Sequence, residues 1–191
     1  MLLKQQYEPE EVCREAEAFA ATVVVFKIKI AELAFASGLE RAAIERFRCG
    51  ADDISTTVLF KILKVLTPNE RNFYNSLIAI QNAAADADIT MPLLDFAPSV
   101  KSDVYRDALT LTLEIFGISR ADVYSKAKMQ PANFSNWIAG KRGINLSNLA
   151  KIKSALTREQ RTFFESVADI YVCLEPHPPD RPVTGELIAV A

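Results

Sequence analysis

The sequence has 191 residues, half of them hydrophobic and about a quarter charged, and its formal net charge is −2. This composition provides enough apolar side chains for a core and argues against a chain that is disordered throughout. Only 6 glycines stand against many Ala, Leu, Glu and Lys residues, which favour helices. We expect an all-α fold of one large or two small domains.

The N-terminal elements are acidic and then apolar. The segment EPEEVCREAE at 8–17 precedes the apolar run ATVVVF at 21–26. This run is too short to cross a bilayer. A signal peptide begins with basic residues, whereas the residues before this run are acidic. Because Cys13, Cys49 and Cys173 are widely spaced, they predict neither a disulfide framework nor a zinc site. We expect a cytoplasmic protein without membrane association.

The chain repeats itself with an offset of 90 residues and no gaps. The identical pairs are Ala31 and Ala121, Ala42 and Ala132, Gly50 and Gly140, Ile54 and Ile144, Leu59 and Leu149, Lys61 and Lys151, Ile62 and Ile152, Leu66 and Leu156, Thr67 and Thr157, Arg71 and Arg161, Phe73 and Phe163, and Ser76 and Ser166. Other pairs are conservative, such as Phe47 with Trp137. A fixed period indicates repeated structural units. We interpret 8–84 and 102–174 as two copies of one helical unit.

Start and stop signals divide the second copy into helices. Ser102 is expected to cap a helix over 103–116. Ser119 and Asp122 resemble a capping box for a short helix that ends near Ala127.

Three further helices are expected in this copy. The first starts near Gln130, has Pro131 in its first turn and stops at Gly140. Asn145 and Thr157 are expected to cap the other two, so that each copy holds about five helices.

The first copy has an equivalent capping box in Thr67, Pro68 and Glu70. Between the copies, 85–101 contains two prolines and weak periodicity, and we interpret it as a connector. The proline-rich tail at 175–191 is expected to be extended or disordered.

Basic charge is concentrated in the second copy. Between Gly117 and Arg161, nine basic residues stand against two acidic ones, a local balance of +7. Between Lys27 and Arg71, eight bases stand against six acids, a balance of +2. Localised positive charge is typical of a nucleic-acid site, because affinity for DNA increases with the number of phosphates neutralised.

The segments between Leu113 and Leu156 read, in order, FGIS, SRADVYSKA, QPANFSNWIAG and KRGINLSNLAKIKSAL. They resemble a helix-turn-helix domain of the Cro and lambda-repressor-like family, also called the XRE type. Ser135 and Trp137, with the glycine that follows, are similar to the family's Ser-x-Trp-x-x-Gly pattern, although Ile138 stands where a glutamate is usual. The resemblance implies two tandem lambda-repressor-like domains, double-stranded DNA as the partner, and a bacterial, phage or plasmid source.

The helix after Met129 is the implied recognition helix. Its apolar residues, such as Phe134 and Trp137, are expected to face the interior. Short polar side chains remain outward, where asparagine or glutamine pairs with adenine, and alanine touches a thymine methyl group. The expected base contacts are Gln130, Ala132, Asn133, Ser135 and Asn136, and the expected backbone contacts are Lys141 and Arg142, with Arg120 at a further family position that reaches DNA. A solvated helix face and loop is the alternative interpretation of these residues.

The first copy matches the family less well. Glu45 replaces the serine, and acidic Asp52 and Asp53 follow the glycine where the family tends to be basic. We expect this copy to serve pairing or partner binding, which its apolar helix AFAATVVVF suits, although that helix is equally typical of a buried core. Its candidate secondary DNA contacts are Arg41, Arg46 and Arg48.

Other chemistries fit the motifs poorly. Gly140 and Lys141 lack the earlier glycine of a phosphate-binding loop, and Arg142 stands where Ser or Thr would bind Mg²⁺. The single histidine, His177, lies in the tail, and neither GxSxG nor HExxH occurs. We expect no enzyme activity, cofactor, metal or small-molecule ligand.

Two functions remain in view. The first is a sequence-specific transcriptional regulator, acting as a homodimer whose second copies occupy half-sites about one helical turn apart. The alternative is a protein-interaction module that keeps the fold without binding DNA, such as an antirepressor or an antitoxin-like partner. The negative net charge and the acidic first copy favour this alternative.

Overall fold

The computed structural model describes residues 9–90 and 103–174, and every regular element in these two stretches is a helix. The expected all-α class is therefore confirmed for this part of the chain. Its ten helices are α1 (Pro9–Val25), α2 (Ile30–Ser37), α3 (Arg41–Arg48), α4 (Thr56–Val65), α5 (Pro68–Asp86), α6 (Val104–Ile115), α7 (Arg120–Lys126), α8 (Pro131–Ile138), α9 (Leu146–Ala155) and α10 (Arg158–Leu174).

The helix boundaries follow the same offset as the sequence. Helices α2 to α5 begin at Ile30, Arg41, Thr56 and Pro68, and helices α7 to α10 each begin 90 residues after their counterparts. Backbone positions with positive φ recur at that offset, namely Lys27 with Gly117, Gly38 with Lys128, and Gly50 with Gly140. Such residues end helices by turning the chain away from the helix axis. Apart from their first helices, α1 and α6, the two halves therefore share their helix starts and their turns.

Side-chain caps explain where several helices begin. Ser119 and Asn145 each accept a hydrogen bond from the amide three residues ahead, at 3.1 and 2.8 Å. Thr67 and Thr157 form reciprocal capping boxes with the side chain three residues ahead. These four predicted caps are confirmed, and each satisfies an amide that would otherwise lack a partner.

Two predicted boundaries differ from the structure. The cap of α6 is Asp103 and not Ser102, because the Asp103 carboxylate accepts hydrogen bonds from two amides of the first turn. Helix α5 continues to Asp86, so the connector expected at 85–101 begins later than predicted. Most of that connector, Ser102 and the tail at 175–191 lie outside the described residues.

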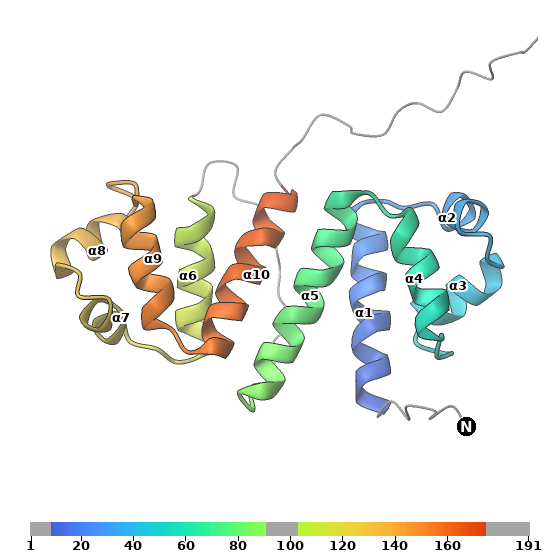
Figure 1. The fold of residues 1–191 in the computed structure, drawn as a ribbon, viewed down its shortest axis with the longest axis horizontal. Helices are drawn as coiled ribbons and strands as arrows, with labels where there is room; N and C mark the ends of the chain where they lie inside the picture. Colours follow the sequence, from blue (N-terminus) through green and yellow to red (C-terminus); the bar gives the residue numbers. More distant parts are fainter. Residues whose placement is uncertain (1–8, 91–102, 175–191) are drawn as a thin grey trace, which may run out of the picture.

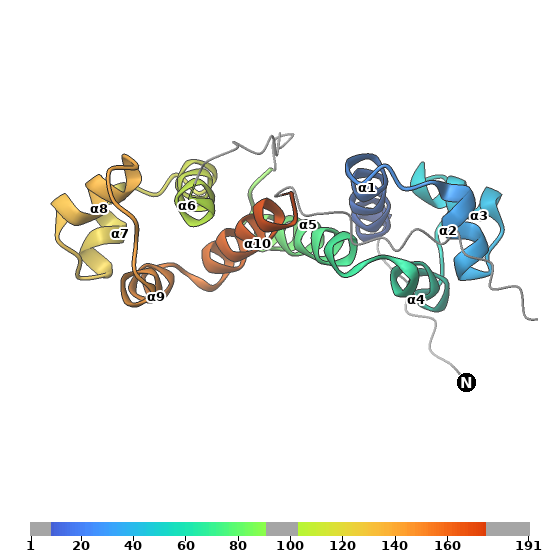
Figure 2. The same cartoon turned by 90° about the horizontal axis from the view of Figure 1, so that it is seen from above.

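The four longest helices form a row across the middle of the molecule. Both views show the order α6, α10, α5 and α1, with α5 and α10 running in opposite directions (Figures 1 and 2). Packing is most extensive between α10 and α5, followed by α10 with α6 and α1 with α5. The short helices α2 and α3 lie at one end of this row, and α7 and α8 lie at the other. The result is an elongated molecule.

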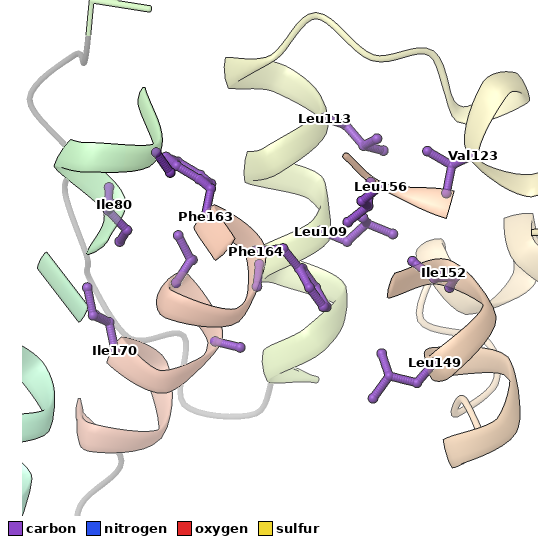
Figure 3. Close-up of a cluster of buried hydrophobic side chains, with 14 of the residues drawn as sticks. Ile80, Leu109, Leu113, Val123, Leu149, Ile152, Leu156, Phe163, Phe164 and Ile170 are labelled. Carbon is purple, nitrogen blue, oxygen red and sulfur yellow. The ribbon is translucent and has the colours of Figure 1, made fainter. Parts of the chain in front are cut away.

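Two clusters of buried hydrophobic residues hold the helices together. One lies among α1 to α5, where the rings of Phe19 and Phe47 stack with their centroids 5.4 Å apart. The other lies among α6 to α10 and also includes Phe73 and Ile80 from α5. Figure 3 shows Ile80 near Phe163 of α10. Helix α5 therefore contributes to both clusters and ties the two halves together.

Candidate nucleic-acid interface

A short turn joins helices α7 and α8, and hydrogen bonds between backbone groups hold it. Lys128 has a φ of 51°, and the amides of Lys128 and Met129 donate hydrogen bonds of 3.0 and 2.9 Å to carbonyls of α7. This pattern satisfies the last carbonyls of a helix and redirects the chain. Gln130 then adopts an extended backbone as the N-cap of α8, and Pro131 occupies the first turn, where no amide partner is needed.

One face of α8 is buried in the second cluster. Phe134 and Trp137 are 0% and 2% exposed, and their rings meet edge to face at a centroid distance of 6.1 Å. Met129 and Ile138 are partly buried against the same cluster. The predicted inward stripe of α8 is therefore confirmed.

A hydrogen bond fixes this buried face to the start of α6. The indole Nε1–H of Trp137 donates to Asp103 Oδ2 at 2.7 Å. The same carboxylate caps α6, so one side chain orients two helices. The sequence pattern did not predict this hydrogen bond, because Asp103 lies 34 residues from Trp137. The available signal was only that a buried tryptophan N–H usually finds an acceptor.

The opposite side of α8 is open to solvent. Gln130, Ala132, Asn133 and Ser135 are exposed, and Asn136 is half-buried. The polar side chains among them make no hydrogen bond with the part of the chain that the structure describes. The structure thus brings the five expected base-contacting residues together at one end of the molecule (Figure 1).

The loop after α8 passes close to α6. Gly140 has a φ of 71°, and a Cβ atom added to it would lie 2.9 Å from Arg106 Nη1. The guanidinium group of Arg106 therefore fills the space beside this glycine, while its Nε donates to Asp107 Oδ1 at 3.1 Å. The sequence pattern did not point to Arg106, because only the packing of α6 brings it next to the loop that carries Lys141 and Arg142.

The basic residues expected to contact DNA are accessible. Lys141 and Arg142 are exposed, as is Arg120 at the first position of α7. Within 103–174, the ion pairs are Arg106 with Asp107 and Lys153 with Glu165. No carboxylate of the described chain lies within ion-pair distance of Lys141 or Arg142. Their charge is therefore available to an external anion.

Helix α3 occupies the corresponding place in the first half, but its charge is largely compensated. Arg46 forms an ion pair with Asp52, and Arg48 Nη2 lies 2.8 Å from Glu45 Oε2. Arg41 is exposed at the first position of the helix. Two of the three candidate secondary contacts therefore have acidic partners within their own half.

Full or partial desolvation raises the pKa of several groups in the row of long helices. The affected groups are Tyr74 on α5 and Asp169, Tyr171 and Cys173 on α10, with the pKa of the Cys173 thiol raised to about 11. Shifted acids and nucleophiles can mark a catalytic site. Here they report on helix packing, and none of the four belongs to α7, α8 or the loop that follows.

The described residues provide neither a metal site nor a membrane-spanning helix. Within 9–90 and 103–174, no group of three or more His, Cys, Asp and Glu side chains is arranged to hold a metal ion. No helix in these stretches combines the length and the apolar character that a bilayer crossing requires. The histidine at position 177 lies outside them. No family model matches the chain, and neither does any curated protein or solved structure.

Proposed function

We propose that this chain is a sequence-specific, double-stranded DNA-binding transcriptional regulator, in which α7, the turn and α8 act as a helix-turn-helix. The observation that best supports this proposal is the open face of α8. It presents Asn133, Ser135 and Asn136 without competing hydrogen bonds from the described chain. Short amide and hydroxyl groups can donate to and accept from base edges, and asparagine pairs with adenine through two hydrogen bonds.

The loop after α8 supports a role in binding the DNA backbone. Lys141 and Arg142 are exposed and have no acidic partner within the described chain, whereas the Arg106 guanidinium beside Gly140 is paired with Asp107. Contacts to phosphates set the register of a protein on the duplex, whereas contacts to bases select the sequence. In this proposal, Lys141, Arg142 and Arg120 hold the domain on the DNA backbone while α8 enters the major groove.

The contacts that hold α8 in place are consistent with a role in contacting bases. A base contact requires that the side chain be held in a fixed orientation, which in turn requires a fixed helix. Phe134 and Trp137 are buried, and the hydrogen bond from Trp137 to Asp103 connects α8 to α6. The helix is therefore restrained from two directions.

A second candidate function is protein binding through the first half. Phe35 on α2 and Phe60 on α4 are 92% and 65% exposed, whereas their counterparts Ser125 and Ala150 are small. Aromatic residues are enriched in protein interfaces. In this candidate the chain keeps the fold and acts through a protein partner instead of DNA.

The proposed function is tested by selecting duplexes from a random pool with the full chain and then comparing variants on enriched and random DNA. Asn133→Ala and Asn136→Ala should each reduce the preference for the enriched site by about 1–3 kcal/mol and should leave binding to random DNA intact. Arg46→Ala, at the position of α3 that corresponds to Asn136, is the matched control and should retain the preference.

Two outcomes would contradict this assignment in different ways. An equal loss on enriched and random DNA would show that the two asparagines do not read bases. A pool without any enriched sequence would favour the second candidate, protein binding through the first half.

A further inference from the structure

The contact between α5 and α10 joins the two copies of the repeat. These helices are equivalent, since they begin at Pro68 and Arg158, 90 residues apart. They run in opposite directions and form the most extensive helix–helix contact of the described chain (Figures 1 and 2). Two equivalent helices that meet in opposite directions are related by an approximate two-fold axis between them.

Equivalent residues are buried on both sides of this contact. The pairs, with their exposed fractions, are Phe73 (1%) with Phe163 (0%), Ser76 (6%) with Ser166 (7%), and Ile80 (1%) with Ile170 (0%). Figure 3 places Ile80 and Ile170 at the boundary of the two helices. Both copies therefore use the same surface.

In a two-fold homodimer, the same surface patch of two chains meets itself across the interface. The contact between α5 and α10 has the same arrangement. Here the first half supplies the partner from within the chain. Helix α10 is covered by α6 on one side and by α5 on the other. A second chain cannot use this face of α10 unless it displaces α5.

The two copies of the repeat form a pair within one chain, which we call the internal pair. The regions around α3 and α8, at its two ends, differ chemically. The expected DNA contacts Asn133, Asn136, Lys141 and Arg142 correspond to Ala43, Arg46, Ala51 and Asp52. Arg46 is occupied by its ion pair with Asp52. At these four positions the first half therefore has neither an amide for bases nor an uncompensated cation for phosphates, so it is a poor second reader of DNA.

We propose that a single chain is a complete internal pair, which binds DNA with a stoichiometry of one chain per duplex and reads one non-palindromic site through α8. This inference rests on the proposed function. It differs from the homodimer expected from the sequence, in which two α8 helices would read the two halves of a palindrome. The contact between α5 and α10 takes the place of the subunit interface of a homodimer. Because the α3 and α8 regions differ, only α8 recognises the DNA sequence.

The test uses the full chain in three measurements. Sedimentation equilibrium of the free protein over an approximately hundredfold range of concentration should give a monomer, and its melting temperature should not depend on concentration. Selection from random duplexes should yield a consensus without two-fold symmetry. Titration of the enriched duplex at concentrations well above the dissociation constant should saturate at one chain per duplex.

The outcomes separate this inference from the proposed function. A dimer of the free chain, or a palindromic consensus saturated by two chains, would overturn the internal pair and leave DNA binding standing. A monomer that enriches no sequence would instead overturn the proposed function, and the one-sided site with it.

Discussion

The two halves of the chain share a backbone plan and differ in their surfaces. Helices α2 to α5 and α7 to α10 start with one offset, and the turns with positive φ recur at the same offset. Buried positions carry like residues, such as Phe73 and Phe163, whereas exposed positions diverge, as Lys141 and Ala51 do. Because exposed substitutions usually change stability little, a repeated fold can be retained while its surfaces specialise.

The largest expected effect concerns Trp137, whose counterpart Phe47 needs no hydrogen-bond acceptor. Asp103→Ala removes both the cap of α6 and the acceptor for the indole N–H. We expect the free energy of unfolding, measured by urea denaturation, to fall by about 2–4 kcal/mol. In a Trp137→Phe background only the cap is lost, and the decrease should be about 1 kcal/mol. Equal decreases in the two backgrounds would show that the hydrogen bond contributes nothing.

The next prediction exchanges the charges of the two loops. Lys141→Ala with Arg142→Ala should weaken binding to all DNA and reduce the slope of log affinity against log salt by about 2. The reciprocal change, Ala51→Lys with Asp52→Arg, should strengthen binding to random duplexes at low salt, because it also releases Arg46 from its ion pair. Fluorescence anisotropy titrations between low and moderate salt measure both effects. An unchanged slope in the first variant would remove Lys141 and Arg142 from the interface.

A smaller effect is expected at the turn between the short helices. Gly38 and Lys128 occupy the same left-handed position, with φ of 66° and 51°. A side chain with a Cβ is strained there, so Lys128→Gly should raise the free energy of unfolding by up to about 1 kcal/mol. Gly38→Lys should lower it by about 1 kcal/mol. Chemical denaturation of both variants checks the pair, and a destabilised Lys128→Gly protein would contradict the strain.

The smallest expected effect concerns Asp169 on α10, whose counterpart on α5 is Ala79. The Asp169 side chain is exposed, but partial desolvation of its carboxyl, followed by the nearby Glu165 carboxylate, raises the pKa of Asp169, while Lys153 opposes the shift. A raised pKa means that the protonated carboxyl favours the folded state, so its stabilising contribution at acidic pH is lost as pH rises through the folded pKa. Asp169→Asn should therefore raise the melting temperature slightly at pH 7 and have little effect near pH 3. Asp53→Asn, on an exposed loop, is the control, and a gain of equal size at both pH values would exclude the ionisation of Asp169 as the cause.

Much of the fold could be predicted because its signals are local. The capping side chains of Ser119, Asn145, Thr67 and Thr157 lie three residues from the amides that they satisfy. The inward stripe of α8 followed from helical periodicity. The cap at Asp103 was missed because Ser102 and Asp103 are both good caps, and the choice between them depends on which carboxyl or hydroxyl reaches the first turn.

The candidate site was predictable only in part. The exposure of Asn133 and its neighbours follows from the burial of Phe134 and Trp137 on the other face of α8. The ion pair between Arg46 and Asp52 was indicated only by the acidic residues Asp52 and Asp53 after Gly50, since a sequence does not show which side chains meet.

The sequence by itself determined the helical class and most helix starts, because these depend on residues within one or two turns of each other. It also showed the repetition directly, because equivalent residues recur at a fixed offset of 90 positions. Only the tertiary structure decided that α5 packs on α10, that Asp103 receives the Trp137 indole, and that Arg106 lies beside Gly140. Each of these contacts joins residues far apart in the chain. The free energy that selects them comes from burying shared surface in three dimensions, and no local pattern encodes which surfaces will be shared.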